Sequence, residues 1–318
     1  MAGAIAGTAI LKAQSLTERL HTITLTINNE CNLKCPHCYL QYNSNKYLIN
    51  NITIDSIFNS DFKHLVIVGR EPLYNKDSID IITKIIQLSK EHDVSLSIVT
   101  NGLNLLNIPK NFIKYINYID VSFDGGNKSY EIYRKGNLRR IIKGIQYVSY
   151  YGIHEVNALY TISDKTISNI DDFISLIRYF QFPNIMFSPY LITENHGFNS
   201  VKPIKLHDII EKLVNDHFFM NSPESFLLID NYHLEQDKID SHEIEEFIQT
   251  NKLHEKIKLF KHDPLFHGII RVTYDDLVMT PRDSLHTKRY CQTNIFASKT
   301  NLNEVFQLLQ MTELEYAN

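Results

Sequence analysis

The sequence lacks the features that membrane, exported and nucleic-acid-binding proteins share. No apolar run reaches the roughly 18 residues of a membrane span. The segment Met1–Ile10 has no basic stretch and is soon followed by Lys12, Glu18 and Arg19, so we expect no signal peptide and a soluble, cytoplasmic protein. Charges of both signs are mixed along the chain, and the formal net charge is −4. We therefore expect no nucleic-acid partner and no membrane partner.

Cysteine is also scarce. The chain has four cysteines, of which Cys31, Cys35 and Cys38 lie close together and Cys291 lies far away. A disulfide framework spreads its cysteines over a short secreted chain, and neither condition holds here. Clustered thiols in a chain without an export signal indicate metal binding, and a cytosolic redox poise keeps such thiols available as ligands.

The composition is that of a globular protein. Of 318 residues, 43% are hydrophobic and 21% are charged, which suits one large α/β domain, alone or with a smaller appendage. Short β-branched runs alternate with helical periods from about His21 to Pro189. The predicted strands are Thr22–Ile27, His64–Val68, Val94–Thr100, Tyr118–Phe123, Val156–Thr161 and Asn184–Ser188. The helical stretches between them include Ser78–His92, Tyr130–Tyr150 and Ile167–Phe180.

Repeats of strand then helix predict a parallel sheet with crossover helices and with ligands at the carboxyl ends of the strands. Periodicity leaves open whether the sheet closes into an eight-fold barrel or stays open after six strands. The alternation of strand and helix patterns ends after Leu191, and the composition of Thr193–Pro203 is typical of a loop or linker. Beyond it we expect two helices, at Leu206–Phe219 and Ile239–Phe260. A β-hairpin follows, with strands Ile269–Tyr274 and Leu277–Thr280 on either side of Asp275–Asp276, and a last helix spans Leu302–Leu309. We therefore divide the chain into an N-terminal extension (1–20), a core (21–192) and a C-terminal extension (193–318).

The three clustered cysteines follow directly on the first predicted strand, with the spacing C-x3-C-x2-C. Three thiolates on one loop can each bind one iron of a cubane cluster, which leaves the fourth iron without a protein ligand and open for chemistry. Three alternatives remain: a zinc site completed by His37 or Cys291, ferredoxin-like electron transfer, and buried cysteines without a metal.

The spacing, together with the aromatic Tyr39 after Cys38, resembles the signature of the radical S-adenosylmethionine (radical SAM) superfamily. The resemblance implies a partial (β/α)6 barrel of parallel strands, here with a small α+β C-terminal extension. It also implies a [4Fe–4S] cluster on the three cysteines, and S-adenosylmethionine that the reduced cluster cleaves to a 5′-deoxyadenosyl radical. His37 stands where many relatives carry an aromatic residue beside the adenine, so it is a candidate for stacking there, with zinc ligation as the competing reading.

The stretch Gly69-Arg70-Glu71-Pro72, after the second strand, resembles the Gly-Gly-Glu-Pro motif that holds the amino group of the cofactor's methionine in this superfamily. A glycine at a strand end allows backbone to approach a ligand, and a glutamate suits an ammonium group. Arg70 replaces the second glycine, which leaves the backbone geometry of this turn open.

Polar segments also end the third and fourth strands. Thr100-Asn101-Gly102 and Ser122-Phe123-Asp124-Gly125 resemble two further motifs of the superfamily. In the following Tyr133-Arg134-Lys135-Gly136, Arg134 resembles the arginine that often meets the cofactor carboxylate. Each segment by itself is also a common strand-end turn. The order of all of them along the chain supports the resemblance.

The fifth and sixth strands offer weaker candidates: Asn157, Thr161, Ser188 and Tyr190. Comparable positions in the superfamily contact the ribose, the adenine or the methionine carboxylate, and core or loop roles are equally open for each.

The predicted hairpin and last helix loosely resemble the SPASM or twitch extension of some relatives. Cys291 alone cannot hold an auxiliary cluster, so we expect none and interpret the extension as a lid or substrate platform, with Cys291 as a structural cysteine or a radical-relay thiol. The resemblance implies an electron donor such as flavodoxin or ferredoxin. It favours modification of a ribosomally made peptide, with radical conversion of a small molecule (an amino acid, sugar or nucleoside) as the alternative. A cluster scaffold without turnover, which Arg70 favours, is the third possibility.

Overall fold

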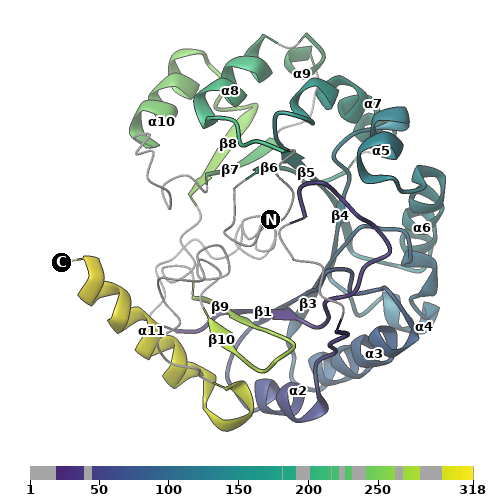
Figure 1. The fold of residues 1–318 in the computed structure, drawn as a ribbon, viewed down its shortest axis with the longest axis vertical. Helices are drawn as coiled ribbons and strands as arrows, with labels where there is room; N and C mark the ends of the chain where they lie inside the picture. The colour runs from purple at the N-terminus through teal and green to yellow at the C-terminus, as the bar shows by residue number, and fades with distance from the viewer. Residues whose placement is uncertain are drawn as a thin grey trace.

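The fold is built around one continuous sheet, which Figure 1 shows as an open ring of strands with helices on its outer side. The structure is a computed structural model that describes residues 19–38, 45–180, 182–190, 201–215, 217–221, 226–230, 241–261, 268–279 and 296–317. Within these ranges no helix is both long enough and apolar enough to cross a membrane.

The sheet has ten strands in the order β10-β9-β1-β2-β3-β4-β5-β6-β7-β8. They are β1 (Thr22–Thr26), β2 (His64–Val68), β3 (Ser95–Thr100), β4 (Tyr118–Ser122), β5 (Glu155–Ile162), β6 (Ile185–Pro189), β7 (Phe226–Asp230), β8 (Ile257–Lys261), β9 (Ile269–Val272) and β10 (Val278–Met279). All neighbours pair in parallel except β9 and β10, which form the expected hairpin. The edge strands β8 and β10 do not pair with each other in the described part of the chain, so the barrel is open. The predicted α/β partial barrel is confirmed.

The helices are α2 (Asn51–Phe58), α3 (Lys76–Glu91), α4 (Lys110–Ile113), α5 (Asn127–Arg134), α6 (Leu138–Tyr150), α7 (Ile170–Phe180), α8 (Leu206–Val214), α9 (His217–Asn221), α10 (Ser241–Thr250) and α11 (Leu302–Ala317). The single helix predicted over Tyr130–Tyr150 is wrong, because the chain breaks it between α5 and α6. Lys135 has a left-handed backbone with φ of 57°, and Asn137 begins α6 by accepting a hydrogen bond from the Arg140 N–H.

The helix predicted over Ile239–Phe260 is also too long. It ends at Thr250 as α10, Lys252 takes a φ of 58°, and the chain then enters β8. Both β8 and β7 were missed by the sequence reasoning. They extend the sheet beyond β6, while β9 extends it beyond β1. The predicted boundary near 192–193 lies in a segment outside the described residues, and the division into domains stays a prediction.

Alternation along each strand separates two faces of the sheet. On β1, Ile23 and Leu25 pack into the core between sheet and helices, while the alternating Thr22, Thr24 and Thr26 point to the inner face of the ring. A second, smaller apolar cluster lies on that inner face and comprises Val66, Val68, Val99, Leu159, Met186 and Leu227. The inner face otherwise carries buried polar side chains, such as Ser97 and Ser122. Polar side chains of the strands are therefore directed to the inside of the ring.

Candidate active site

The cysteine loop and the ends of several strands line one pocket. Cys31, Cys35 and Cys38 are free thiols. They line this pocket together with residues from the ends of β2, β3 and β4 and from α5. The predicted site residues that line it are Cys31, Cys35, His37, Cys38, Gly69, Arg70, Glu71, Thr100, Asn101, Ser122 and Arg134. The carboxyl ends of parallel strands meet at one edge of a sheet, and that is where the pocket lies.

Hydrogen bonds shape the loop around the sulfur atoms. The Cys38 N–H donates to the Cys35 carbonyl at 3.1 Å, and the Leu33 N–H donates to Cys31 Sγ at 3.3 Å. From the end of β3, Asn101 Nδ2 donates to Asn32 Oδ1 at 2.8 Å and lies 3.7 Å from Cys31 Sγ. Donors directed at sulfur stabilise a metal-bound thiolate.

The donor set fits an iron–sulfur cubane. Burial raises the pKa of Cys31 to about 12 and that of Cys35 to about 11, so metal binding has to displace their protons. A zinc ion needs a fourth ligand, and the obvious one, His37, has both ring nitrogens engaged elsewhere. Among the described residues the pocket therefore offers three sulfurs from one loop, which matches a cluster with one open iron.

A buried ion pair stands behind the loop. Asp124, which is fully buried, contacts Arg134 through Nε and Nη2, both at 2.5 Å, and contacts His37 Nε2 at 3.1 Å. The Thr161 N–H donates to its other carboxylate oxygen at 2.6 Å. Burial by itself would raise the pKa of Asp124, but Arg134 and His37 outweigh it and hold that pKa well below its usual range.

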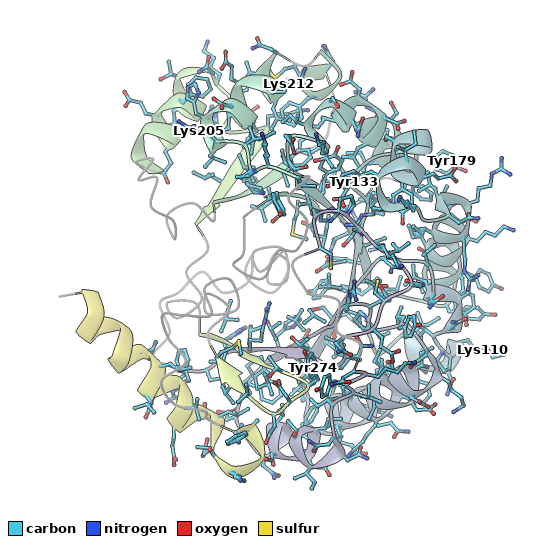
Figure 2. All side chains as sticks on the ribbon, viewed as in Figure 1. Lys110, Tyr133, Tyr179, Lys205, Lys212 and Tyr274 are labelled. Atoms are coloured by element: carbon cyan, nitrogen blue, oxygen red, sulfur yellow. The ribbon has the colours of Figure 1, made fainter. Side chains whose placement is uncertain are left out.

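His37 is part of this network rather than a free ring. Burial lowers its pKa, so the imidazole is neutral. We assign the proton to Nε2, which donates to Asp124, because Nδ1 lies 3.0 Å from the hydroxyl of Tyr133 and accepts from it. The two rings are parallel, with centroids 5.2 Å apart. Tyr133 lies on the side of α5 toward the ring interior, whereas Tyr179 projects outward from α7 (Figure 2).

Glu71 is held with both carboxylate oxygens in use. Oε1 accepts from the Thr100 hydroxyl at 2.6 Å and from the Leu73 N–H at 3.0 Å, and Oε2 accepts from the Asn101 N–H at 2.7 Å. Burial raises the pKa of Glu71, and these three hydrogen bonds oppose that effect. A carboxylate has about four acceptor positions, so one position on Oε2 remains for a ligand donor such as an ammonium group.

Asn28, which the sequence analysis did not single out, explains why residue 69 is a glycine. A Cβ at Gly69 would lie 2.4 Å from Asn28 Oδ1. Asn28 Nδ2 donates to the Glu71 carbonyl and to Ser78 Oγ, both at 2.9 Å, and the Arg70 N–H donates to the Asn28 carbonyl. Asn28 therefore fixes the turn that carries Glu71, and Pro72 is buried in the same turn. The one available signal was that Asn28 directly follows the first predicted strand.

Four of the described predicted site residues do not line the pocket: Pro72 and Asp124, which lie behind it as given above, and Asn157 and Tyr190. Asn157 sits near the start of β5, where it donates to Asp120 Oδ1 at 2.8 Å and accepts from Asn184 Nδ2 at 3.0 Å. It contributes to a polar network inside the ring and is not brought to the carboxyl ends of the strands. Tyr190 is buried just after β6. Tyr39 and Cys291 lie outside the described residues.

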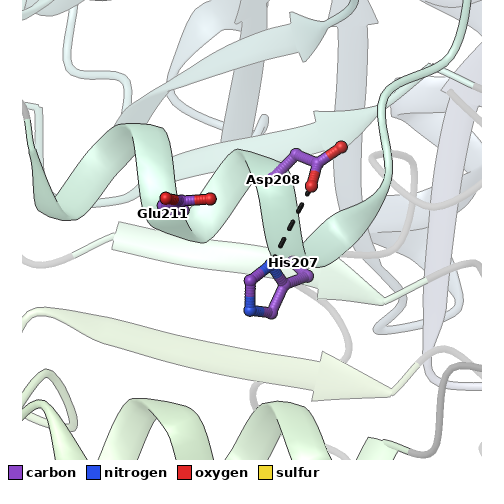
Figure 3. A group of neighbouring side chains, drawn as sticks. All are labelled: His207, Asp208 and Glu211. Carbon is purple, nitrogen blue, oxygen red and sulfur yellow. Dashed lines mark ion pairs between the residues drawn. The ribbon is translucent and has the colours of Figure 1, made fainter.

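A second group of metal-ligating residue types lies on α8 (Figure 3). His207, Asp208 and Glu211 are all exposed, and His207 Nδ1 is 3.8 Å from Asp208 Oδ1. Exposed acidic side chains on one helix are common without an ion, and the His207 ring packs edge-on against Phe247. We assign this group no function.

Comparisons with known proteins agree with this geometry. The sequence profile of the Radical SAM superfamily matches residues 25–177. A probable GTP 3′,8-cyclase from Methanococcus vannielii is 27% identical over 162 residues, which are 48% of this chain and 53% of that protein. The chain spans about half the length of the curated relatives it matches.

Solved structures share the fold at low identity. SuiB of Streptococcus suis bound to precursor peptide SuiA has a TM-score of 0.62 at 11% identity, over 94% of this chain and 67% of SuiB. The protein anSMEcpe with bound AdoMet (S-adenosylmethionine) has a TM-score of 0.55 at 15% identity, over 90% of this chain and 82% of anSMEcpe. The superfamily uses a [4Fe–4S] cluster and S-adenosylmethionine. The profile match and the cysteine loop together establish that this chain carries a domain of the radical SAM superfamily over residues 25–177.

Proposed function

We propose that this protein is a radical S-adenosylmethionine enzyme whose cluster is bound by Cys31, Cys35 and Cys38. The observation that carries the proposal is the convergence of these thiols with Glu71 and Ser122 in one pocket at the strand ends. When bound there, the reduced cluster supplies the electron that cleaves S-adenosylmethionine to methionine and a 5′-deoxyadenosyl radical. Hydrogen abstraction from a substrate follows from that chemistry.

The chain's own residues hold and orient the cofactor. Glu71 keeps one acceptor position for the cofactor's ammonium group, while Thr100 and the Asn101 N–H fix the direction of its carboxylate. Ser122 presents a hydroxyl to the pocket from the inner face of β4. All of these groups lie at or next to the carboxyl ends of strands, so the sheet fixes the backbone from which each one projects.

In this proposal Arg134 has a second role besides the contact with the cofactor carboxylate that the resemblance implies. Its guanidinium is committed to Asp124 and is almost fully buried. Its role in our proposal is to hold Asp124 and, through it, His37 next to Cys38. Arg134 is therefore a positioning residue for the cysteine loop, and it retains only its pocket-facing edge for a cofactor.

The substrate has two candidate classes. Modification of a ribosomally made peptide is supported by the fold likeness to SuiB, which was crystallised with precursor peptide SuiA. Conversion of a small molecule is supported by the similarity to proteins named GTP 3′,8-cyclase. Either reaction needs a one-electron donor such as flavodoxin or ferredoxin.

The deciding experiment is anaerobic reconstitution with iron and sulfide, then reduction with dithionite in the presence of S-adenosylmethionine and assay for 5′-deoxyadenosine. We expect the product from the wild-type protein and none from Cys31→Ala, Cys35→Ala or Cys38→Ala. Cys291→Ala is the matched control, and it should keep about four irons per chain, as one cubane requires. Stoichiometric zinc without a cluster, or a cluster that yields no 5′-deoxyadenosine, would refute the proposal.

A further inference from the structure

A buried arginine on the inner face of the sheet has no bonded carboxylate among the described residues to balance its charge. Arg271 is 2% exposed, and its Nε and Nη2 atoms bond to nothing in the part of the chain that the structure describes. Burying an unpaired cation is among the most costly arrangements in a folded protein. Such a group calls for a functional explanation.

The strand pattern fixes the direction of this side chain. Arg271 lies on β9 between Ile270 and Val272, both of which pack into the core between sheet and helices. Alternation therefore points Arg271 to the opposite face, inside the ring. Its Cα partner on β1 is Thr24, whose Oγ1 is also buried without a partner among the described residues. A guanidinium and a hydroxyl thus stand side by side, and both can donate.

This pair shares the inner face with the cofactor pocket. Val68 and Val99 line that pocket and belong to the apolar cluster of the inner face. In the sheet, β9 is the neighbour of β1, and β1 is the neighbour of β2, whose end carries the pocket residues Gly69 and Glu71. A molecule held by Arg271 and Thr24 would therefore lie on the β1–β9 side of the pocket. The cysteine loop begins on this side, because it follows β1.

The carboxylates nearest in the chain are already engaged. Asp276 accepts hydrogen bonds from the Thr53 hydroxyl and from the Ser298 N–H, and Asp275 accepts from the Thr273 hydroxyl. Neither is bonded to Arg271. No carboxylate in the part of the chain that the structure describes is bonded to Arg271, which leaves its guanidinium available to a ligand.

We infer that Arg271 and Thr24 form a subsite for an oxyanion, a carboxylate or a phosphate, carried by the substrate of the proposed radical reaction. A guanidinium offers a fork of parallel N–H donors that matches either group, and the threonine hydroxyl adds a third donor. The inference rests on the proposed function for the identity of the ligand as substrate. The binding chemistry itself depends only on the two side chains.

Binding of two simple probes tests the subsite. Inorganic pyrophosphate and succinate are titrated separately into the anaerobically reconstituted protein at constant ionic strength, with calorimetry and thermal unfolding as readouts. Arg271→Met should weaken binding of the preferred anion by about tenfold to a hundredfold, the range for a hydrogen bond to a charged group. Arg178→Met, the same change at an exposed position on α7, is the matched control and should bind like the wild type. Preference for pyrophosphate assigns a phosphorylated substrate, and preference for succinate assigns a carboxylate.

Two further variants guard against misfolding. Arg271→Lys keeps the charge but loses the fork, so it should bind with intermediate affinity. Thr24→Val keeps the shape and removes the hydroxyl, which should weaken binding by about twofold to tenfold. Without an anion, Arg271→Met should be at least as thermostable as the wild type, because an uncompensated charge has been removed.

Equal binding of both probes by the wild type and Arg271→Met would overturn the inference, as would a wild type that binds neither. Marked destabilisation of anion-free Arg271→Met would also overturn it, because the guanidinium would then have an internal partner. No step of these measurements requires turnover. Failure of the proposed function would instead appear as absence of 5′-deoxyadenosine from the wild type, so the two failures are distinguishable.

Discussion

Replacing Asp124 by asparagine tests the ion pair behind the cysteine loop. The carboxylate has no exposure and faces Arg134, which is itself 3% exposed. In Asp124→Asn the Arg134 charge stays buried without a counter-charge, and the new amide directs donors toward existing donors. Removing one partner of a buried pair costs about 3–5 kcal/mol. Typical domains unfold with about 5–15 kcal/mol, so this single change should bring the protein close to its stability limit.

The assay is equilibrium urea unfolding of the reduced, metal-free protein, followed by far-ultraviolet circular dichroism. Asp208→Asn is the matched control, because Asp208 is 57% exposed and only 3.8 Å from His207, and it should cost at most about 1 kcal/mol. The double variant Asp124→Leu with Arg134→Met should recover much of the lost stability, since it removes both charges. A loss for Asp124→Asn no larger than that of Asp208→Asn would refute the reasoning.

Three further predictions follow from the same geometry. The difference in unfolding free energy between wild type and Asp124→Asn should shrink below about pH 4. The lowered pKa of Asp124 stabilises the fold fully only at pH values above the pKa of the carboxyl group in the unfolded chain, and this stabilisation is lost as the pH falls further. Urea titrations across about pH 2–7 measure the difference. Gly69→Ala should abolish S-adenosylmethionine binding in calorimetry, because its Cβ would lie 2.4 Å from Asn28 Oδ1; retained affinity would contradict the proposed tight turn. Thr100→Val removes one of three hydrogen bonds to Glu71 and should weaken cofactor binding by about twofold to tenfold; an unchanged dissociation constant would remove Thr100 from the positioning set.

The sequence predicted the parts of this fold that local pattern determines. Strands β1 to β6 were found because each is a short β-branched or apolar run, which both faces of a covered parallel sheet require. Strand β8 was missed because its residues Ile257–Lys261 continue the helical spacing of α10, and only the left-handed turn at Lys252 separates the two. Such a turn leaves little trace in a sequence when its residue is not glycine.

The site was predicted to a similar depth. Spacing and order along the chain singled out the cysteines and Glu71, and the structure brings them into one pocket. The sequence did not reveal the contacts of Arg134, because Asp124 and His37 lie beside its guanidinium only in the folded chain. Arg271 had no motif at all; its importance comes from burial without a partner, which only a structure reveals.

The pairing of β9 with β1 has a consequence for biosynthesis. Thr22 is matched in register with Ile269, so one edge of the strand that leads into the cysteine loop stays uncovered until almost the whole chain has left the ribosome. Contacts of such long sequence separation form late, and an open strand edge invites pairing with other chains in the meantime. We expect release of nascent chains before residue 269 to yield aggregates. Maturation of the metal centre should then follow translation rather than accompany it.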